Sequence, residues 1–168
     1  DTIIAPAFGQ DLSRVACIAC GQCVLACPTG SLVEKECIES VWEALEDPDK
    51  FVVVQTAPSI QVTLGEEFGF PVGSVVTGKL VAALQRLGFD RVFATDFTAD
   101  LTVMEEAHEL LERLEGRGKL PLLTSCCPGW VKFAEHFYPE YLENLSTCKS
   151  PHEMFGALAK TYFARKEG

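Results

Sequence analysis

Apolar residues recur at helical spacing in several stretches of the chain. Ile38, Val41, Trp42 and Leu45 lie three or four positions apart, which is the pattern of a helix with one buried face. The same periodicity, together with capping residues, predicts helices over residues 35–47, 77–87 and 99–115, from Pro128 onward, and from the Ser150-Pro151 cap to about Arg165.

Short apolar runs alternate with these helices, at residues 51–57, 91–96 and 120–125. Strand–helix alternation predicts an α/β fold, a three-stranded parallel sheet with flanking helices and right-handed crossovers. Ligands of open parallel sheets bind beyond the carboxyl ends of the strands. The turns after the three runs are therefore expected to lie close together, namely Ala57-Pro58, Asp96 and Ser125-Cys126-Cys127.

Residues 1–34 differ from the rest, because they are rich in Gly, Pro and Cys and show no helical period longer than one turn. Such a segment cannot fold on a hydrophobic core of its own and needs a metal to hold it together. The chain is thus expected to comprise a metal-held module over residues 1–34, a helical connector over 35–50 and an α/β domain over 51–168.

Composition and charge narrow the class of protein. Among 168 residues, 48% are hydrophobic and 23% charged, which is typical of a globular chain. The 24 acidic residues exceed the 14 basic ones, so binding to nucleic acid or to an anionic membrane surface is disfavoured. No apolar run approaches the ~20 residues that span a bilayer, and the first residues do not follow a signal-peptide pattern. The absent initiator Met predicts a fragment, a processed chain or a trimmed one, and eight cysteines without an export signal favour metal binding in a reducing, cytoplasmic compartment.

Four of the cysteines form the run Cys17-x2-Cys20-x2-Cys23-x3-Cys27-Pro28, which is the spacing of a 4Fe–4S ferredoxin. Structural zinc and a disulfide knot are the alternatives. In two-cluster ferredoxins the fourth cysteine of such a run binds the other cluster. Cys17, Cys20 and Cys23 would then hold one cube and Cys27 a second, and the chain contains no partner run. Half of a ferredoxin-like iron–sulfur module is expected.

A second cysteine pair lies in Thr124-Ser-Cys-Cys-Pro-Gly-Trp130, where the third predicted strand ends and Pro128 begins a helix. A helix N-terminus favours the thiolate form of a nearby cysteine. Adjacent side chains point in different directions, so one thiol can bind a metal while the other faces a substrate. Two buried structural cysteines are the alternative.

The segment TSCCPGW resembles the first active-site motif of the iron-only (FeFe) hydrogenases. CIACGQCVLACPTGSL resembles their accessory ferredoxin domain, and TAPSI, VTGKLVAALQRLGFDRVF, ADLTVMEEAHELLERLE and KSPHEMFGALAKTYF resemble the family in the same order. The resemblance implies part of the catalytic large subunit, with half of the accessory domain followed by the first half of the catalytic domain. It also implies 4Fe–4S clusters, an active centre in which a cube is bridged by a cysteine sulfur to a two-iron site, and reversible reduction of protons to hydrogen.

The resemblance further implies roles for single residues. Cys127 resembles a ligand of the catalytic cube, and Cys126 resembles the thiol that hands protons to the two-iron site. Glu106, Glu109 and Arg113 resemble the proton relay that leads outward, with Ser146 between the carboxylates. Their i, i+3 and i+7 spacing does place the three on one helix face, although a solvated acidic face is the alternative. Ala57, Pro58, Ser59, Ser150 and Pro151 resemble the residues that line the pocket of the two-iron site.

The family's second and third motifs, which supply the other three cube ligands, are expected further along than Gly168. The remainder of the hydrogenase polypeptide or a second subunit is therefore an expected partner, together with a ferredoxin or similar electron carrier and with protons and hydrogen. No nucleic acid and no membrane is expected. The alternatives are a non-catalytic iron–sulfur relative used in cluster assembly or sensing, which would not need Cys126 or a proton relay, and a plain ferredoxin-type electron carrier.

Overall fold

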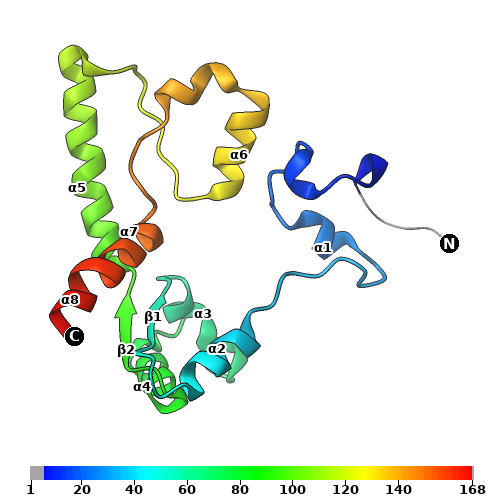
Figure 1. The fold of residues 1–168 in the computed structure, drawn as a ribbon, viewed down its shortest axis with the longest axis vertical. Helices are drawn as coiled ribbons and strands as arrows, with labels where there is room; N and C mark the ends of the chain where they lie inside the picture. Colours follow the sequence, from blue (N-terminus) through cyan, green and yellow to red (C-terminus); the bar gives the residue numbers. More distant parts are fainter. Residues whose placement is uncertain (1–5, 168) are drawn as a thin grey trace. The chain divides into compact units, whose positions relative to one another are not determined.

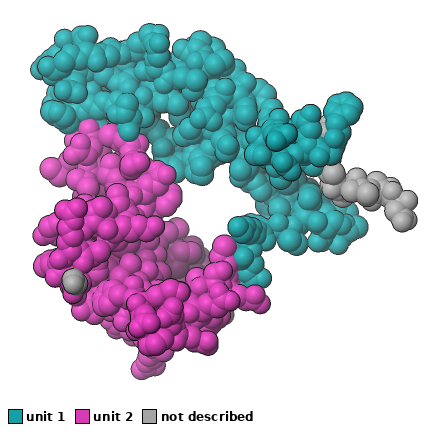
Figure 2. Space-filling model, viewed as in Figure 1, with its two compact units in different colours: residues 1–36, 106–147 teal, residues 37–105, 148–168 magenta. Residues whose placement is uncertain are grey.

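The structure, a computed structural model, describes residues 6–167. These residues are mostly helical and contain one small sheet (Figure 1). The chain forms two compact units. Unit 1 comprises residues 1–36 and 106–147, and unit 2 comprises residues 37–105 and 148–168 (Figure 2). Among the described helices, none is both long and apolar enough to cross a membrane.

The sheet of unit 2 consists of two parallel strands, β1 (Val53–Thr56) and β2 (Arg91–Ala94), with Val53 opposite Arg91 and Thr56 opposite Ala94. The helix α2 (Ile38–Glu46) precedes β1, and α3 (Ile60–Glu67) and α4 (Thr77–Leu87) connect the strands. The sequence pattern therefore predicted α2, α4 and both strands correctly. It missed α3, whose apolar and polar residues are hardly segregated between two faces.

The C-terminal helices of unit 2 pack on this sheet. They are α7 (Pro151–Leu158), the π-helical turn η5 (Ala159–Phe163) and α8 (Ala164–Glu167). The predicted capping box at Ser150 and Glu153 is present, so the start of α7 is determined locally. Phe155 is buried, and its ring centroid lies 5.1 Å from that of Phe93 on β2.

The long helix α5 (Asp96–Glu112) begins in unit 2 and continues into unit 1. Its buried residues in unit 2 are Thr98 and Thr102, whereas Met104, which the pattern placed on an apolar side, is 69% exposed. The threonines can be buried because each hydroxyl donates to a backbone carbonyl one turn earlier, Thr98 to Thr95 at 3.0 Å and Thr102 to Thr98 at 2.8 Å. Leu111 and Leu114 are exposed as well.

Unit 1 combines the N-terminal segment with residues 106–147. Its helical elements are the short turns η1 (Ala7–Gly9) and η2 (Leu12–Arg14), α1 (Gln22–Ala26), the π-helical turn η3 (Arg113–Arg117), α6 (Pro128–Phe137) and η4 (Pro139–Asn144). The predicted start of α6 at Pro128 is confirmed. The sequence missed α1, which is only five residues long and lies inside the cysteine run.

The predicted third strand, residues 120–125, is wrong as part of the sheet. In the described chain the sheet has two strands, and this segment makes only an isolated parallel bridge between Leu123 and Leu145. The Leu123 N–H donates to the Asn144 carbonyl at 2.8 Å, and the Ser146 N–H donates to the Leu123 carbonyl at 2.8 Å. Both hydrogen-bonding groups of Leu123 are thus used within unit 1, and Pro121 has no N–H to offer a strand.

Two of the three expected strand-end turns do lie together. In unit 2 the Gln61 amide, just after Ala57-Pro58, donates to the Asp96 carboxylate at 2.9 Å. The Thr77 hydroxyl donates to the same Gln61 side chain at 2.8 Å, and Thr77 is the first helical residue of α4, with Val76 as the N-cap residue. The third turn, with Cys126, belongs to unit 1, and its closeness to the other two stays a prediction.

Candidate functional site

The two adjacent cysteines of unit 1 lie where α6 begins. Cys127 is the N-cap residue in extended conformation, and Pro128 is the first helical residue. The Cys127 N–H donates to the Ser125 hydroxyl at 3.0 Å, which holds the turn before the helix. Both Cys126 and Cys127 are exposed thiols.

Residues 17–27 form a loop, here called the cysteine loop, which holds the four cysteines of the run and contains α1. Ala19 and Gly21 both have positive φ, 56° and 73°, which turns the backbone sharply between the cysteines. The Ala19 N–H points at the Cys17 sulfur at 3.4 Å. Backbone N–H groups directed at cysteine sulfur are the arrangement that stabilises a metal-bound thiolate.

Cys27, at the end of the run, has an environment that favours a thiolate. The Thr29 hydroxyl, 3.5 Å from the sulfur, and then backbone N–H groups of Leu32, Thr29 and Ser31 lower the pKa of Cys27 to about 6. Thiolates are the ligands of iron–sulfur clusters, so the donor set fits such a cluster chemically. Within residues 6–167, however, no three Cys, His, Asp or Glu side chains are gathered into a metal-binding group.

The cysteine loop lies against the start of α6 within unit 1. A Cβ atom placed on Gly129 would lie 3.1 Å from the Ile18 carbonyl oxygen and 3.6 Å from the Cys127 sulfur. The missing side chain of Gly129 therefore allows backbone from the run that begins at Cys17 to approach the Cys126–Cys127 turn. The structure thus places the backbone at Ile18 next to the turn at Cys127, about a hundred residues later in the sequence.

Glu109 is the centre of a hydrogen-bonded group in unit 1. The Ser146 hydroxyl donates to one carboxylate oxygen at 2.6 Å, and the Thr147 N–H donates to both oxygens at 3.2 and 3.3 Å. Burial alone would raise the pKa of Glu109, but the bonds from Ser146, Arg113 and Thr147 outweigh it and hold that pKa below its usual range. The sequence analysis placed Ser146 beside Glu109 but missed Thr147. Thr147 binds Glu109 through its backbone N–H, which any residue type except proline could supply.

Glu106, one turn earlier on α5, has the opposite shift. Burial and then the negative charge of Glu109 raise the pKa of Glu106. Two carboxyl groups on one helix face thus differ in proton affinity because their surroundings differ. Such a pair can include a group that holds a proton beside one that stays ionised, which is a recurrent feature of acid–base sites.

Arg113 holds the Glu109 side chain in place. Its guanidinium binds the Glu109 carboxylate at 2.7 Å and is 7% exposed. All of its N–H groups have partners, because the remaining donors reach backbone carbonyl oxygens at 2.7 to 3.2 Å. The carbonyls belong to Lys119, Glu143, Asn144 and Leu145. Nothing in the sequence pattern points to these backbone partners.

The sequence-predicted pocket residues form a second group in unit 2. Ala57, Pro58 and Ser59 follow β1 and lead into α3, with the Ile60 N–H donating to the Ala57 carbonyl at 3.2 Å. Ser150 and Pro151 are the N-cap and first residue of α7. The cysteines, Glu106, Glu109, Arg113 and Ser146 belong to unit 1, so the structure groups the predicted site residues into two sets.

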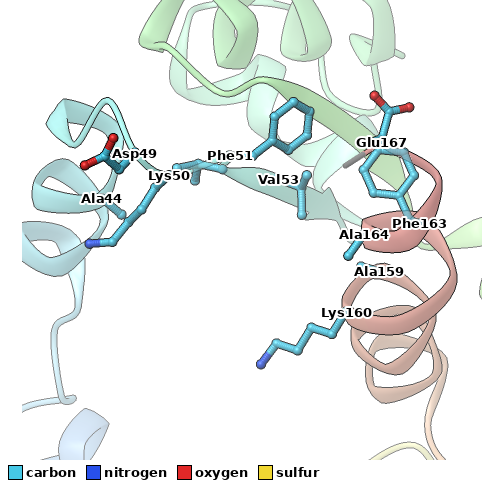
Figure 3. Close-up of a pocket in the computed structure, with 11 residues that line it drawn as sticks. Ala44, Asp49, Lys50, Phe51, Val53, Ala159, Lys160, Phe163, Ala164 and Glu167 are labelled. Atoms are coloured by element: carbon cyan, nitrogen blue, oxygen red, sulfur yellow. The ribbon is translucent and has the colours of Figure 1, made fainter.

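A groove of unit 2 holds none of the predicted site residues. It has a volume of about 1020 Å³ and lies between the β1 side of the sheet and the C-terminal helices (Figure 3). The wall of the groove is mainly aliphatic and aromatic, and its charged residues are Asp49, Lys50, Lys160 and Glu167. The groove therefore offers a surface for apolar packing rather than a group of polar side chains directed at one point. The lining residues are Ala44, Asp49, Lys50, Phe51, Val52, Val53, Ala159, Lys160, Phe163, Ala164 and Glu167.

Comparison with known proteins identifies both parts of the chain. Residues 50–167 match the family described as iron only hydrogenase large subunit, C-terminal domain, and residues 14–33 match the 4Fe–4S binding domain family. The chain is 58% identical to the NADP-reducing hydrogenase subunit HndD of Solidesulfovibrio fructosivorans over 96% of this chain and 29% of that protein. It is 51% identical to the periplasmic Fe hydrogenase large subunit of Nitratidesulfovibrio vulgaris over 77% of this chain and 31% of that protein.

The fold agrees with the sequence comparison. A variant of the FeFe-hydrogenase HydA1 from Chlamydomonas reinhardtii superimposes with a TM-score of 0.75 at 41% identity, over 80% of this chain and 35% of that one. The chain spans about a third or less of the length of these relatives. Because the family match covers more than half of the chain, and because the cysteine motifs fall within the matched residues or beside them, the chain belongs to the family of iron only hydrogenase large subunits.

Proposed function

We propose that this chain forms part of an iron-only hydrogenase that reversibly reduces protons to hydrogen, with electrons delivered through 4Fe–4S clusters. In this proposal residues 1–34 form a partial ferredoxin-type module and residues 51–168 form the first α/β half of the catalytic domain. Residues 35–50 are a helical connector between the two. The family membership and the cysteine motifs support the reaction class. The chain by itself is expected to be inactive, since it offers Cys127 as one ligand of a cube that needs four.

The roles proposed for the cysteines rest on their spacing and, for Cys127, on the resemblance of its motif to the family's first active-site motif. Cys17, Cys20 and Cys23 would bind one 4Fe–4S cluster and Cys27 a second, completed by protein outside this chain. Cys127 would bind the cube of the catalytic centre. When bound, the two-iron site of that centre supplies the redox chemistry of hydrogen, and Ala57, Pro58, Ser59, Ser150 and Pro151 would shape the pocket that excludes water from it.

One observation carries the acid–base part of the proposal: Glu106 and Glu109 share a helix face and have pKa values shifted in opposite directions. Ser146 donates to Glu109, and a hydroxyl both donates and accepts, so it can pass a proton between neighbours. In the proposed path Cys126, Glu106, Ser146 and Glu109 each hold a proton in turn. Arg113 cannot release its proton near neutral pH, so it holds Glu109 in place rather than carrying a proton.

The partners proposed are the remainder of the hydrogenase polypeptide or a second subunit, and a ferredoxin-like electron carrier. A cytoplasmic location is proposed from the eight free cysteines, because reducing compartments keep cysteines free of disulfides. A periplasmic hydrogenase is among the similar proteins, so fractionation of cells that produce the complete protein tests this location.

The decisive experiment uses the complete enzyme with single substitutions on the proposed path. Cys126→Ala and Glu106→Gln should each lower hydrogen evolution by about 10²-fold or more, because a single acid–base group typically contributes 10²–10⁴-fold. Iron and sulfide content should stay at the level of the unsubstituted enzyme. Glu105→Gln, on an exposed face of the same helix, is the matched control and should leave the rate unchanged.

Near-normal hydrogen evolution by Cys126→Ala with a fully loaded centre would contradict the proton path. A non-catalytic role in cluster assembly or sensing predicts something different, namely no hydrogen evolution by the unsubstituted protein. A plain electron carrier predicts that Cys127→Ala leaves the cluster content unchanged, whereas the hydrogenase proposal predicts loss of the catalytic cube.

A further inference from the structure

The side-chain amide of Gln55, on β1, connects the sheet to the start of α7 within unit 2. The Gln55 Nε2 group donates to the His152 carbonyl oxygen at 3.1 Å. The Thr95 hydroxyl, just after β2, donates to Gln55 Oε1 at 3.0 Å. The Gln55 side chain thus joins β1 to two segments that lie 40 and 97 residues later along the chain.

The orientation of this amide follows from its partners. A backbone carbonyl only accepts hydrogen bonds, so the NH₂ group of Gln55 must face His152. The oxygen of the amide then faces Thr95, whose hydroxyl can donate. A carbonyl oxygen has two lone pairs, so the His152 carbonyl can accept from Gln55 and still accept within α7.

The Thr95 partner is itself held firmly. Thr95 is 8% exposed, and its backbone carbonyl accepts from the hydroxyl of Thr98, which is fully buried. Thr102, one turn further along α5, places its hydroxyl 3.3 Å from the Met154 sulfur of α7. The buried threonines Thr95, Thr98 and Thr102 thus lie along the start of α5. The Gln55 side chain connects the first of them to His152, in the first turn of α7.

Apolar packing at the same place also holds α7 on the sheet. The Phe93 and Phe155 rings hold α7 on the sheet, with centroids 5.1 Å apart. Ring contacts are weakly directional, so they set the distance of the helix from the sheet more than its shift along the strand. A directional hydrogen bond from Gln55 to the first turn of α7 fixes that shift.

We propose that Gln55 is a positioning residue, which sets the spacing between the Ala57–Ser59 turn and the N-terminus of α7 at Ser150 and Pro151. Gln55 lies two residues before Ala57, and its acceptor His152 lies two residues after Ser150. The amide therefore spans the base of both segments proposed to line the pocket of the two-iron site. The pocket part of this inference rests on the proposed function, whereas the bridge between β1 and α7 does not.

The test uses two variants of the complete large subunit, each of which removes one side-chain hydrogen bond from unit 2. Gln55→Glu keeps the shape of the side chain but places a carboxylate oxygen opposite the His152 carbonyl, so the bond to α7 is lost. Thr77→Val is the matched control, because it removes the bond from Thr77 to Gln61 between α4 and α3 and leaves α7 untouched. Gln55→Leu removes both bonds of the bridge.

Two readouts separate positioning from general stability. Backbone amide hydrogen exchange over residues 152–156, measured before the two-iron site is inserted, should be about five-fold faster in Gln55→Glu and unchanged in Thr77→Val, since one neutral hydrogen bond contributes about that factor. In the loaded enzyme, the infrared bands of bound carbon monoxide and cyanide should shift or double in Gln55→Glu and stay in place in Thr77→Val.

Unchanged exchange at residues 152–156 in both Gln55 variants would overturn the bridge. Faster exchange with unaltered infrared bands would overturn the positioning role at the pocket. An unsubstituted enzyme with no hydrogen turnover and no such bands would overturn the proposed function, and with it the pocket role. The exchange measurement would then still decide whether the bridge exists.

Discussion

The residues that carry the proposed chemistry are distinguished by their surroundings more than by their type. Glu106 and Glu109 are both glutamates on one face of α5, half-buried, and three residues apart. Only Glu109 receives hydrogen bonds from Ser146, Thr147 and Arg113. The same side chain is thus stabilised as an anion at one position and as a neutral acid at the other.

This difference gives an ordered titration. As the pH falls, Glu106 should bind its proton at a higher pH than Glu109, because the pKa of Glu106 is raised and that of Glu109 is lowered. Any stability that Glu109 contributes is therefore present above the ordinary glutamate pKa of about 4.3 and is lost as the pH falls through its lower folded pKa. Carbon-13 NMR of labelled glutamate carboxyls in the complete protein measures both pKa values.

Glu109→Gln is the informative variant for this titration. It removes the negative charge that raises the pKa of Glu106, so that pKa should fall. Glu105→Gln serves as the control and should leave both values in place. A Glu106 that titrates below Glu109 in the unsubstituted protein would contradict the assignment of the two roles.

Arg113 supports a further prediction at the scale of a single side chain. Substituting a buried member of an ion pair leaves its partners unsatisfied, which typically costs 3–5 kcal/mol. Arg113→Ala would remove the cation beside the Glu109 carboxylate and one donor from each of four backbone carbonyls, so the free energy of unfolding should fall by about 3 kcal/mol. Chemical denaturation of the complete protein measures this, with Arg117→Ala, at a side chain 60% exposed, as the control. Equal, small effects of both variants would contradict the buried role of Arg113.

At the scale of elements, helix termini decide where the candidate chemistry lies. Cys127 caps α6 and Ser150 caps α7, so a local capping signal places each of these residues at the positive end of a helix dipole. Contacts between elements that are distant in the sequence then bring further residues to these helix termini. The cysteine loop reaches α6 only because Gly129 has no side chain between Ile18 and Cys127.

A pair of glycine substitutions tests that contact. Gly129→Ala places a methyl group 3.1 Å from the Ile18 carbonyl, a contact with backbone that the loop can relieve only by moving. Gly156→Ala, in the interior of α7, meets nothing within 4 Å and should stabilise the protein by up to about 1 kcal/mol. Thermal unfolding should therefore shift upward for Gly156→Ala, and hydrogen exchange over residues 17–21 should quicken for Gly129→Ala alone. Unaltered exchange in Gly129→Ala would show that the loop does not depend on this approach.

Few large apolar side chains are buried among the described residues. The buried hydrophobic residues are Val76, Leu80, Ala134 and Phe155, each 6–8% exposed, whereas many aromatic and aliphatic side chains are exposed. A two-stranded sheet is marginal by itself, and parallel sheets are normally covered on both faces. These surfaces fit a chain that completes its core against further protein, in keeping with a length of about a third or less of its relatives.

The 168-residue chain produced alone should therefore behave as an incomplete unit. It should bind a hydrophobic dye in proportion to its exposed apolar surface, and it should neither evolve nor oxidise hydrogen, because Cys127 is the one catalytic-cube ligand proposed within it. After anaerobic reconstitution it should carry at most one labile 4Fe–4S cluster. Dye fluorescence, gas chromatography and iron–sulfide analysis measure these outcomes. Hydrogen turnover, or two stable cubes seen by electron paramagnetic resonance, would show that the ligand count is wrong.

The sequence by itself determined the features that depend on neighbours within a turn or two along the chain. Cysteine spacing indicated the iron–sulfur motif, the Asp47-Pro48 pair ended α2, and the Ser150–Glu153 box began α7. Periodicity correctly located α4 and both strands of the sheet. These signals are local, because caps, turns and metal-ligand spacings are made by residues close together in the sequence.

Only the tertiary structure decided the features that depend on distant partners. The apolar run at residues 120–125 could serve a sheet or a loop, and its pairing with residues 144–146 settled the choice. The pKa of Glu109 is lowered in part by Ser146 and Thr147, which lie 37 and 38 residues later, whereas burial and the charge of Glu109 raise the pKa of Glu106. The amide of Gln55 found its acceptor 97 residues later. Periodicity records only which face of an element is apolar, so it carries no information about which distant donor or acceptor that face will meet.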